Sequence, residues 1–200
     1  IQAGCIFATS LEEWSDLFLL SSLLAGKPKG KGHVAVVSNA GCETVAAADQ
    51  TGGLGSLEMA RLAESTVERL RKVLEQFKLS ELQEVRNPMD LTPMANDRAH
   101  IETVKAFHDD PNVDLIVQSM IPLTAAIRAG AKPDDPEGYV QLLLAGMKTE
   151  FRKPIVSVLD AGAMYDPIGQ ILLEAGIPVF RSIDRALAIL AKWVHGGSYA

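Results

Sequence analysis

The sequence of 200 residues predicts an α/β fold with a doubly wound parallel sheet. Short runs rich in Val, Ile and Leu alternate along the chain with longer segments in which apolar residues recur at helical intervals. This alternation is typical of parallel strands joined by helices, and right-handed crossovers place those helices on both faces of the sheet. An apolar content of 48% is sufficient for a substantial core.

Five strands are expected, at residues 34–37, 57–61, 113–119, 155–159 and 177–180. Their number and spacing favour the flavodoxin-like strand order 2-1-3-4-5. In this order the chain reverses direction between the first and third strands, which leaves a crevice at their carboxyl ends. Functional residues are therefore expected at that edge of the sheet.

The helices follow from periodicity and from end signals. Ser10 precedes Glu13 at the spacing of a capping box, which predicts an N-terminal helix over residues 11–25. Further helices are expected at residues 42–50, 66–77, 98–108, 139–151, 166–175 and 184–194. A Gly/Lys/Pro-rich stretch follows the first helix, so we expect a connector over residues 1–32 and one domain over residues 33–200.

Composition excludes several classes of partner. A net charge of -6 and a pI near 5.2 give no broad positive field, so neither nucleic acid nor a membrane is an expected partner. The only dense basic cluster, residues 27–31, is expected to be a solvated linker. The two cysteines, Cys5 and Cys42, are too few for a disulfide framework and favour a reducing, cytoplasmic location. Because the sequence begins at Ile1 without an initiator methionine, we expect a fragment of a longer polypeptide.

The stretch HVAVVSNAGCET, at residues 33–44, combines the first strand with the start of the next helix. The unpaired N–H groups at the helix start favour an anion, and Gly41 permits close approach. However, neither G-x-x-x-x-G-K-[ST] nor G-x-G-x-x-G occurs at this turn. A phosphate site and a plain strand-to-helix turn both remain open.

A cysteine at a helix start has an alternative use as a thiolate nucleophile. Cys42 lacks an identifiable base, because none of the four histidines can be assigned to it from sequence, and Glu43 opposes a thiolate charge. We therefore expect Cys42 to be a small packing residue and the chain to contain no catalytic residue. The histidines are His33, His100, His108 and His195.

Other polar residues are expected near the crevice. Residues 78–98 lack a clear period and are expected to form an ordered loop over it. Asp49 and Asp90 allow acid–base chemistry, although loop aspartates also cap turns; Asp160 follows a strand directly and allows ligand contact. Two histidines eight residues apart have no third partner, so no metal site is expected. The predicted crevice residues are Asn87, Asp90, Thr92, Ser119, Pro122, Asp160 and Gly162.

Five motifs in order, GHVAVVSNAG, AAAD, NPMDLT, GAMYDP and EAGIPVFRSIDRAL, resemble the third domain of NDP-forming acyl-CoA synthetases, relatives of succinyl-CoA synthetase. The resemblance covers residues 1–194 and implies a flavodoxin-like ligase-CoA domain. It also implies a CoA-binding domain and a second flavodoxin-like domain before this one, and an ATP-grasp domain later in the chain or in a partner subunit. The parent enzyme would use CoA, ATP or GTP, and Mg²⁺, with no cofactor held by this chain.

The resemblance further implies that the helix after Gly41 faces a phosphohistidine of the preceding domain. Many relatives have Asn-Ala-Gly-Gly-Pro-Gly at this turn, whereas this chain has Asn39, Ala40, Gly41, Cys42, Glu43 and Thr44, its predicted phosphate-facing residues. The alternative is a regulatory or structural module that retains the fold, which the acid at position 43 favours. A free-standing flavin-binding domain is disfavoured, since the turn lacks a hydroxyl-rich phosphate loop.

Overall fold

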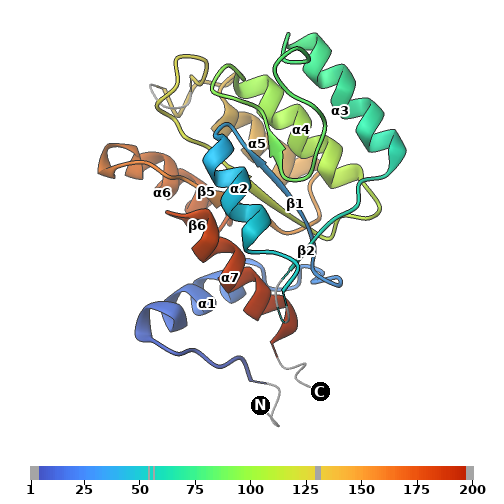
Figure 1. The fold of residues 1–200 in the computed structure, drawn as a ribbon. Helices are drawn as coiled ribbons and strands as arrows, with labels where there is room; N and C mark the ends of the chain where they lie inside the picture. Colours follow the sequence, from blue (N-terminus) through green and yellow to red (C-terminus); the bar gives the residue numbers. More distant parts are fainter. Residues whose placement is uncertain (1–4, 54, 56, 129–131, 197–200) are drawn as a thin grey trace.

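A parallel β-sheet forms the centre of the molecule in the computed structural model, which describes residues 5–53, 55, 57–128 and 132–196 (Figure 1). The strand order is β2-β1-β4-β5-β6, and β3 also pairs with β1. Every pairing is parallel. The strands are β1 (His33–Ser38), β2 (Glu58–Met59), β3 (Met89–Asp90), β4 (Leu115–Ser119), β5 (Ile155–Val158) and β6 (Val179–Phe180).

The predicted order is confirmed, because omitting β3 from the numbering gives 2-1-3-4-5. The expectation of a continuous loop over residues 78–98 was wrong at Met89 and Asp90, which form β3. This strand has only two residues, and its register against Val37 and Ser38 comes from tertiary pairing. A segment so short carries no periodicity that a sequence could reveal.

Seven α-helices occur in the described residues, close to the predicted segments: α1 (Leu11–Leu23), α2 (Gly41–Asp49), α3 (Glu64–Gln76), α4 (Asp97–Asp109), α5 (Tyr139–Thr149), α6 (Asp166–Glu174) and α7 (Ile183–His195). The predicted cap of α1 is confirmed, since the Ser10 side chain accepts a hydrogen bond from Glu13 N at 3.1 Å. Asn96 caps α4 in the same way through Ala99 N. Both caps satisfy N–H groups that the helix itself leaves unpaired.

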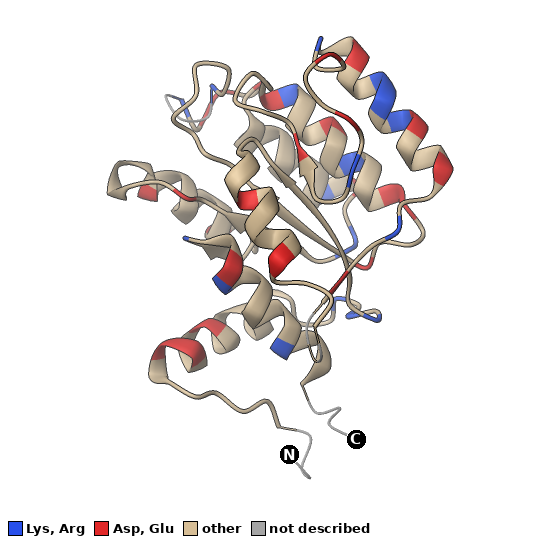
Figure 2. Ribbon diagram, in the orientation of Figure 1, with Lys and Arg blue, Asp and Glu red and all other residues tan. Residues whose placement is uncertain are grey.

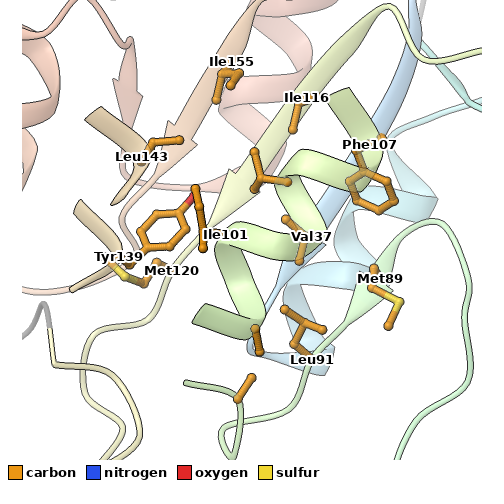
Figure 3. Packing of buried hydrophobic residues seen from close by; sticks show 14 of the residues in the cluster. Val37, Met89, Leu91, Ile101, Phe107, Ile116, Met120, Tyr139, Leu143 and Ile155 are labelled. Atoms are coloured by element: carbon orange, nitrogen blue, oxygen red, sulfur yellow. The ribbon is translucent and has the colours of Figure 1, made fainter. Parts of the chain in front are cut away.

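The sheet separates two apolar cores. Alternate residues of β1 point to opposite faces: Val34 and Val36 pack with residues of α1, α2 and α7, whereas Ala35 and Val37 pack with residues of α4, α5 and α6. Figure 3 shows Val37, Ile116 and Ile155, from three neighbouring strands, on the face covered by α4 and α5. Since these four residues of β1 are fully buried, the strand is anchored on both faces.

Helix α1 packs against α7 rather than against the sheet. Leu17 and Leu20 are buried at this contact, and Arg185 of α7 pairs with Glu12 and Asp16 of α1. A hydrogen bond from Lys192 is the main cause that lowers the pKa of Glu13 to about 2. The predicted connector helix is thus held to the last helix by apolar contact and by ion pairs.

Asn87 connects β1 to the two short strands on its outer edge. Its side-chain amide donates to Val34 O at 2.9 Å and to Ala60 O at 3.1 Å, and its oxygen accepts from Val36 N at 2.9 Å. The amide therefore supplies the hydrogen bonds that β1 would otherwise lack between β2 and β3. This use in the sheet differs from the expected place of Asn87 in the crevice.

Replacing Asn87 with Ala should lower the free energy of unfolding by about 2–4 kcal/mol, because three backbone groups lose their partner. Arg86→Ala is the control, since Arg86 pairs with the exposed Glu84 and should change stability by less than about 0.5 kcal/mol. Urea unfolding of both variants measures the difference. Equal stability of the two variants would contradict the structural role of Asn87.

Candidate functional site

The candidate site is the turn between β1 and α2, at the carboxyl edge of the sheet. Asn39 fixes this turn to the segment after β4, because its side chain donates to Ile121 O at 3.0 Å and accepts from Ile121 N at 2.9 Å. With 1% of its surface exposed, the Asn39 side chain is committed to this contact. Asn39 thus holds the predicted phosphate-facing turn in place through its side chain, and a pairing across 82 residues gives no local sequence signal.

The first turn of α2 has two available backbone donors. Ala40 is the N-cap and provides no side-chain cap, while Glu43 N and Thr44 N already reach Ala40 O at 3.1 and 3.4 Å. Within the described residues, the N–H groups of Gly41 and Cys42 have no hydrogen-bond partner. Figure 2 shows acidic positions on α2 and no Lys or Arg. These two N–H groups, with the helix dipole, are suited to an anion.

A side-chain relay joins the end of β1 to this helix. Ser38 Oγ donates to Glu43 Oε2 and accepts from Ala40 N at 3.0 Å. Glu43 is the third residue of α2, where a capping-box glutamate would bond the N-cap N–H directly. Here the Ser38 hydroxyl mediates that contact, so the carboxyl folds inward instead of into solvent. Sequence reasoning missed this relay because Ser38 precedes Glu43 by five residues rather than three.

Glu43 is a buried acid with one carboxyl oxygen left without a hydrogen bond in the described residues. Only 4% of its surface is exposed, and Oε1 has no hydrogen-bond partner in the described part of the chain. Loss of hydration raises its pKa, and the charge of Asp160 raises it further, against the opposing effect of the Ser119 and Ser38 hydroxyls. Ser119 lies near the carboxyl but outside hydrogen-bond geometry, since its Oγ is also buried and unpartnered.

Asp90, at the end of β3, lies against the start of α2. A Cβ at Gly41 would stand 3.0 Å from Asp90 Oδ2, so a larger residue would press on this carboxylate. Asp90 accepts hydrogen bonds from Thr92 N at 2.8 Å and Gln83 Nε2 at 3.3 Å. The contacts around Gly41 and Glu43 bring Asp90, Ser119 and Asp160 to one edge of the sheet.

The other predicted crevice residues have mixed environments. Pro122 is buried after β4, whereas Asp160 and Gly162 are exposed after β5. Thr92 has a positive φ of 61° and its hydroxyl accepts from Met94 N. Thr44 donates to Gly41 O at 2.9 Å, so its hydroxyl is engaged inside the helix turn.

The histidines make contacts away from the exposed Cys42. His33 lies beside Glu58 and Asp114, and Nε2 of His108 accepts from Arg152 N at 2.9 Å. His100 is fully buried against Tyr139, which lowers its pKa to about 4 through loss of hydration. No base is thereby assigned to Cys42. In the described ranges, His, Cys, Asp and Glu do not form a group of three that could hold a metal ion.

Comparison with known proteins identifies relatives along almost the whole chain. The alpha subunit of acetate–CoA ligase (ADP-forming) II from Pyrococcus furiosus is 30% identical over 203 residues, covering 98% of this chain and 41% of the relative. Acetate–CoA ligase (ADP-forming) I from Archaeoglobus fulgidus is 28% identical over 96% of this chain and 25% of the relative. The chain is homologous to a segment of ADP-forming acetate–CoA ligases.

Solved structures support the fold of this ligase homologue. The apo form of dinucleotide-forming acetyl-coenzyme A synthetase 1 from Ca. Korarchaeum cryptofilum superposes with a TM-score of 0.79 at 21% identity, over 99% of this chain and 41% of that chain. No protein-family model matches the sequence. The chain spans about two-fifths of the length of the Pyrococcus furiosus relative. Its described helices include none long and apolar enough to cross a membrane.

Glu43→Gln should flatten part of the pH dependence of stability. A raised pKa means that the folded state retains a proton that the unfolded state releases, so wild-type stability falls as pH rises from about 4.5 through the folded pKa. The slope of this contribution is at most about 1.4 kcal/mol per pH unit. Urea unfolding across pH measures it.

The matched control is Glu75→Gln on α3, an exposed position where the wild-type pH profile should persist. A Glu43→Gln profile parallel to the wild-type profile over the whole range would show that the carboxyl is not perturbed by burial.

Proposed function

We propose that this chain is the ligase-CoA domain of an NDP-forming acyl-CoA synthetase, which converts an acid, CoA and a nucleoside triphosphate to acyl-CoA, nucleoside diphosphate and phosphate, or the reverse. Similarity to two acetate–CoA ligases supports the reaction class. The parent would contain CoA-binding and ATP-grasp domains, in one polypeptide or in a partner subunit, and would act in the cytoplasm. Residues 1–32 would connect this domain to the preceding one.

The observation that carries the proposal is the pair of free N–H groups at Gly41 and Cys42. We infer that they face a phosphohistidine of the preceding domain. Phosphoryl transfer needs positioned donors for the charge on the moving group, and backbone N–H groups need no reorganisation to supply them. The domain would thus assist the transfer without a catalytic side chain of its own.

CoA, nucleotide and Mg²⁺ are assigned to other domains of the parent. The turn after β1 lacks a Walker sequence, and the described residues offer no three-ligand metal cluster. We derive no step of the reaction through these groups in this domain. Accordingly, the 200-residue chain alone should not release phosphate from ATP in the presence of acetate and CoA.

A second candidate is a regulatory or structural module that retains the fold without phosphate contact. One observation favours it: the Glu43 carboxyl already lies within the first turn of α2, where it interacts with the helix N-terminus from inside. The two functions differ in whether Gly41 and Cys42 receive an external anion.

Gly41→Val in the full-length enzyme should slow single-turnover phosphoryl transfer by a factor of about 10² to 10³, because blocking access to a fixed donor should cost about as much as losing it. The added side chain presses on Asp90 and obstructs the approach to the N–H groups. Cys42→Ala is the control, since it removes an exposed thiol and retains the backbone N–H. Quenched-flow transfer from the labelled histidine gives the rates.

Thermal unfolding of both variants separates transfer from stability. Normal transfer in Gly41→Val would reject the phosphate-facing role and leave the non-catalytic module. A loss in Cys42→Ala equal to that in Gly41→Val would instead favour a reactive thiol.

A further inference from the structure

The start of α2 combines free donors with buried polar atoms that have no partner. The N–H groups of Gly41 and Cys42 have no partner in the described residues, and close to the same turn Glu43 Oε1 and Ser119 Oγ are buried without a hydrogen-bond partner. Both side chains are more than nine-tenths buried. A helix N-terminus alone is common, but a buried acid and a buried hydroxyl left unsatisfied beside it are unusual, because such groups are normally paired.

The carboxyl of Glu43 has acidic rather than basic neighbours. Asp160 acts on it from the segment after β5, and Asp90 stands beside Gly41 at the end of β3. Arg181, after β6, is directed elsewhere: it donates to Ala161 O and pairs with Asp166. From β1 and β4, the hydroxyls of Ser38 and Ser119 act on the carboxyl. For an ionised Glu43, loss of hydration and the charge of Asp160 outweigh the stabilising effect of the two hydroxyls.

We propose that α2 binds an oxyanion together with a proton, which is taken up by Glu43. The proposal rests on the function proposed above, because it concerns the same helix terminus. It adds that the protonation of Glu43 determines the pH range in which an anion binds. The ligand class is a tetrahedral oxyanion, such as a phosphoryl group or sulfate. The carboxyl remains the only group that changes its protonation; no bond of the anion forms or breaks.

Anion binding and protonation of Glu43 are strongly coupled because the two negative groups would lie close together. Glu43 is the third residue of α2, so an anion on the N–H groups of Gly41 and Cys42 would lie within about one helical turn, roughly 5 Å, of its carboxyl. Two like charges at this separation in a partly buried site repel enough to lower affinity by about two orders of magnitude. A neutral carboxyl removes that repulsion and keeps the Ser38 relay, because its oxygens still accept a hydrogen bond.

Burial favours the neutral form even before an anion arrives. Loss of hydration is the main reason why the pKa of Glu43 lies above its ordinary value, and a bound anion would raise it further. Binding and protonation then support each other by linkage. Glu43 replaces part of the Gly-rich turn that many acyl-CoA synthetases have. A protonated Glu43 is compatible with a phosphate site at this turn.

Sulfate tests the proposal in the chain itself, because sulfate does not titrate between pH 5.5 and 8.5, whereas phosphate does. Amide chemical shifts of Gly41 and Cys42 would be followed during sulfate titrations at constant ionic strength. Above the pKa of Glu43, the wild-type dissociation constant should increase about tenfold per pH unit until it reaches a total increase of about 100-fold. Calorimetry in two buffers of different ionisation enthalpy should show uptake of close to one proton per sulfate.

Glu43→Gln is the decisive variant, because it keeps the shape and the acceptor for Ser38 while removing the titration. Its sulfate affinity should be nearly independent of pH and about 100-fold tighter than wild type at the upper end of the range. Asp49→Asn is the matched control: it removes one exposed carboxylate at the opposite end of α2 and should change affinity less than about twofold.

Two results would overturn the proposal. The first is an equal pH dependence of sulfate affinity in wild type and Glu43→Gln, or sulfate binding to the wild type without proton uptake. Either outcome would show that Glu43 is not coupled to the anion, and it would leave the proposed function intact. Sulfate that fails to shift the Gly41 and Cys42 amides in any variant would reject the anion site on this chain. The transfer rates of Gly41→Val in the full enzyme decide the proposed function separately.

Discussion

Strand β1 is paired on both edges and buried on both faces, and the position of the candidate site depends on this constraint. On one edge β1 pairs with β4 over Val34–Val37, and on the other it pairs with β2 at its start and β3 at its end. The Asn87 amide closes the interval between β2 and β3. Because β1 cannot shift without breaking these pairings, the turn that follows Ser38 is fixed relative to the ends of β3 and β4. A helix that begins at such a turn holds its first N–H groups in one place, which is the condition for a preorganised anion site.

The same turn contains a carboxyl that would compete with the proposed anion. Glu43 interacts with the start of α2 through Ser38. A phosphate bound at this helix start would therefore lie beside a carboxyl of the protein. Its burial removes hydration, and Asp160 adds repulsion. The two candidate functions therefore differ in a protonation state rather than in a fold. With an ionised Glu43 the helix start is compensated from within, and with a neutral Glu43 its donors are available to an external group.

Much of this architecture could be predicted from sequence, and the remainder depends on contacts between distant residues. The β1 and β4 segments are continuous apolar runs, and α4 and α7 have clear helical periods, so their existence and the strand order followed from pattern. The two residues of β3 have no such pattern and are a strand only because β1 lies beside them. Likewise, nothing local indicates that Asn39 turns toward Ile121 or that the Glu43 carboxyl folds inward. The resemblance to acyl-CoA synthetases located the turn, but the direction of each side chain came from the packing.

Unsatisfied buried groups do not by themselves identify a site, as His100 demonstrates. Both of its ring nitrogens and the Tyr139 hydroxyl lack partners in the described structure, yet they are enclosed between α4 and α5. With a pKa of about 4, His100 stays neutral near neutral pH, so its burial does not require a counter-charge. Glu43 differs because its neutral form requires a proton that solvent removes as pH rises, and because two free backbone donors stand on the same helical turn. A titratable buried acid beside vacant donors would link protonation to anion binding, whereas an imidazole that stays neutral would bring no such pH dependence.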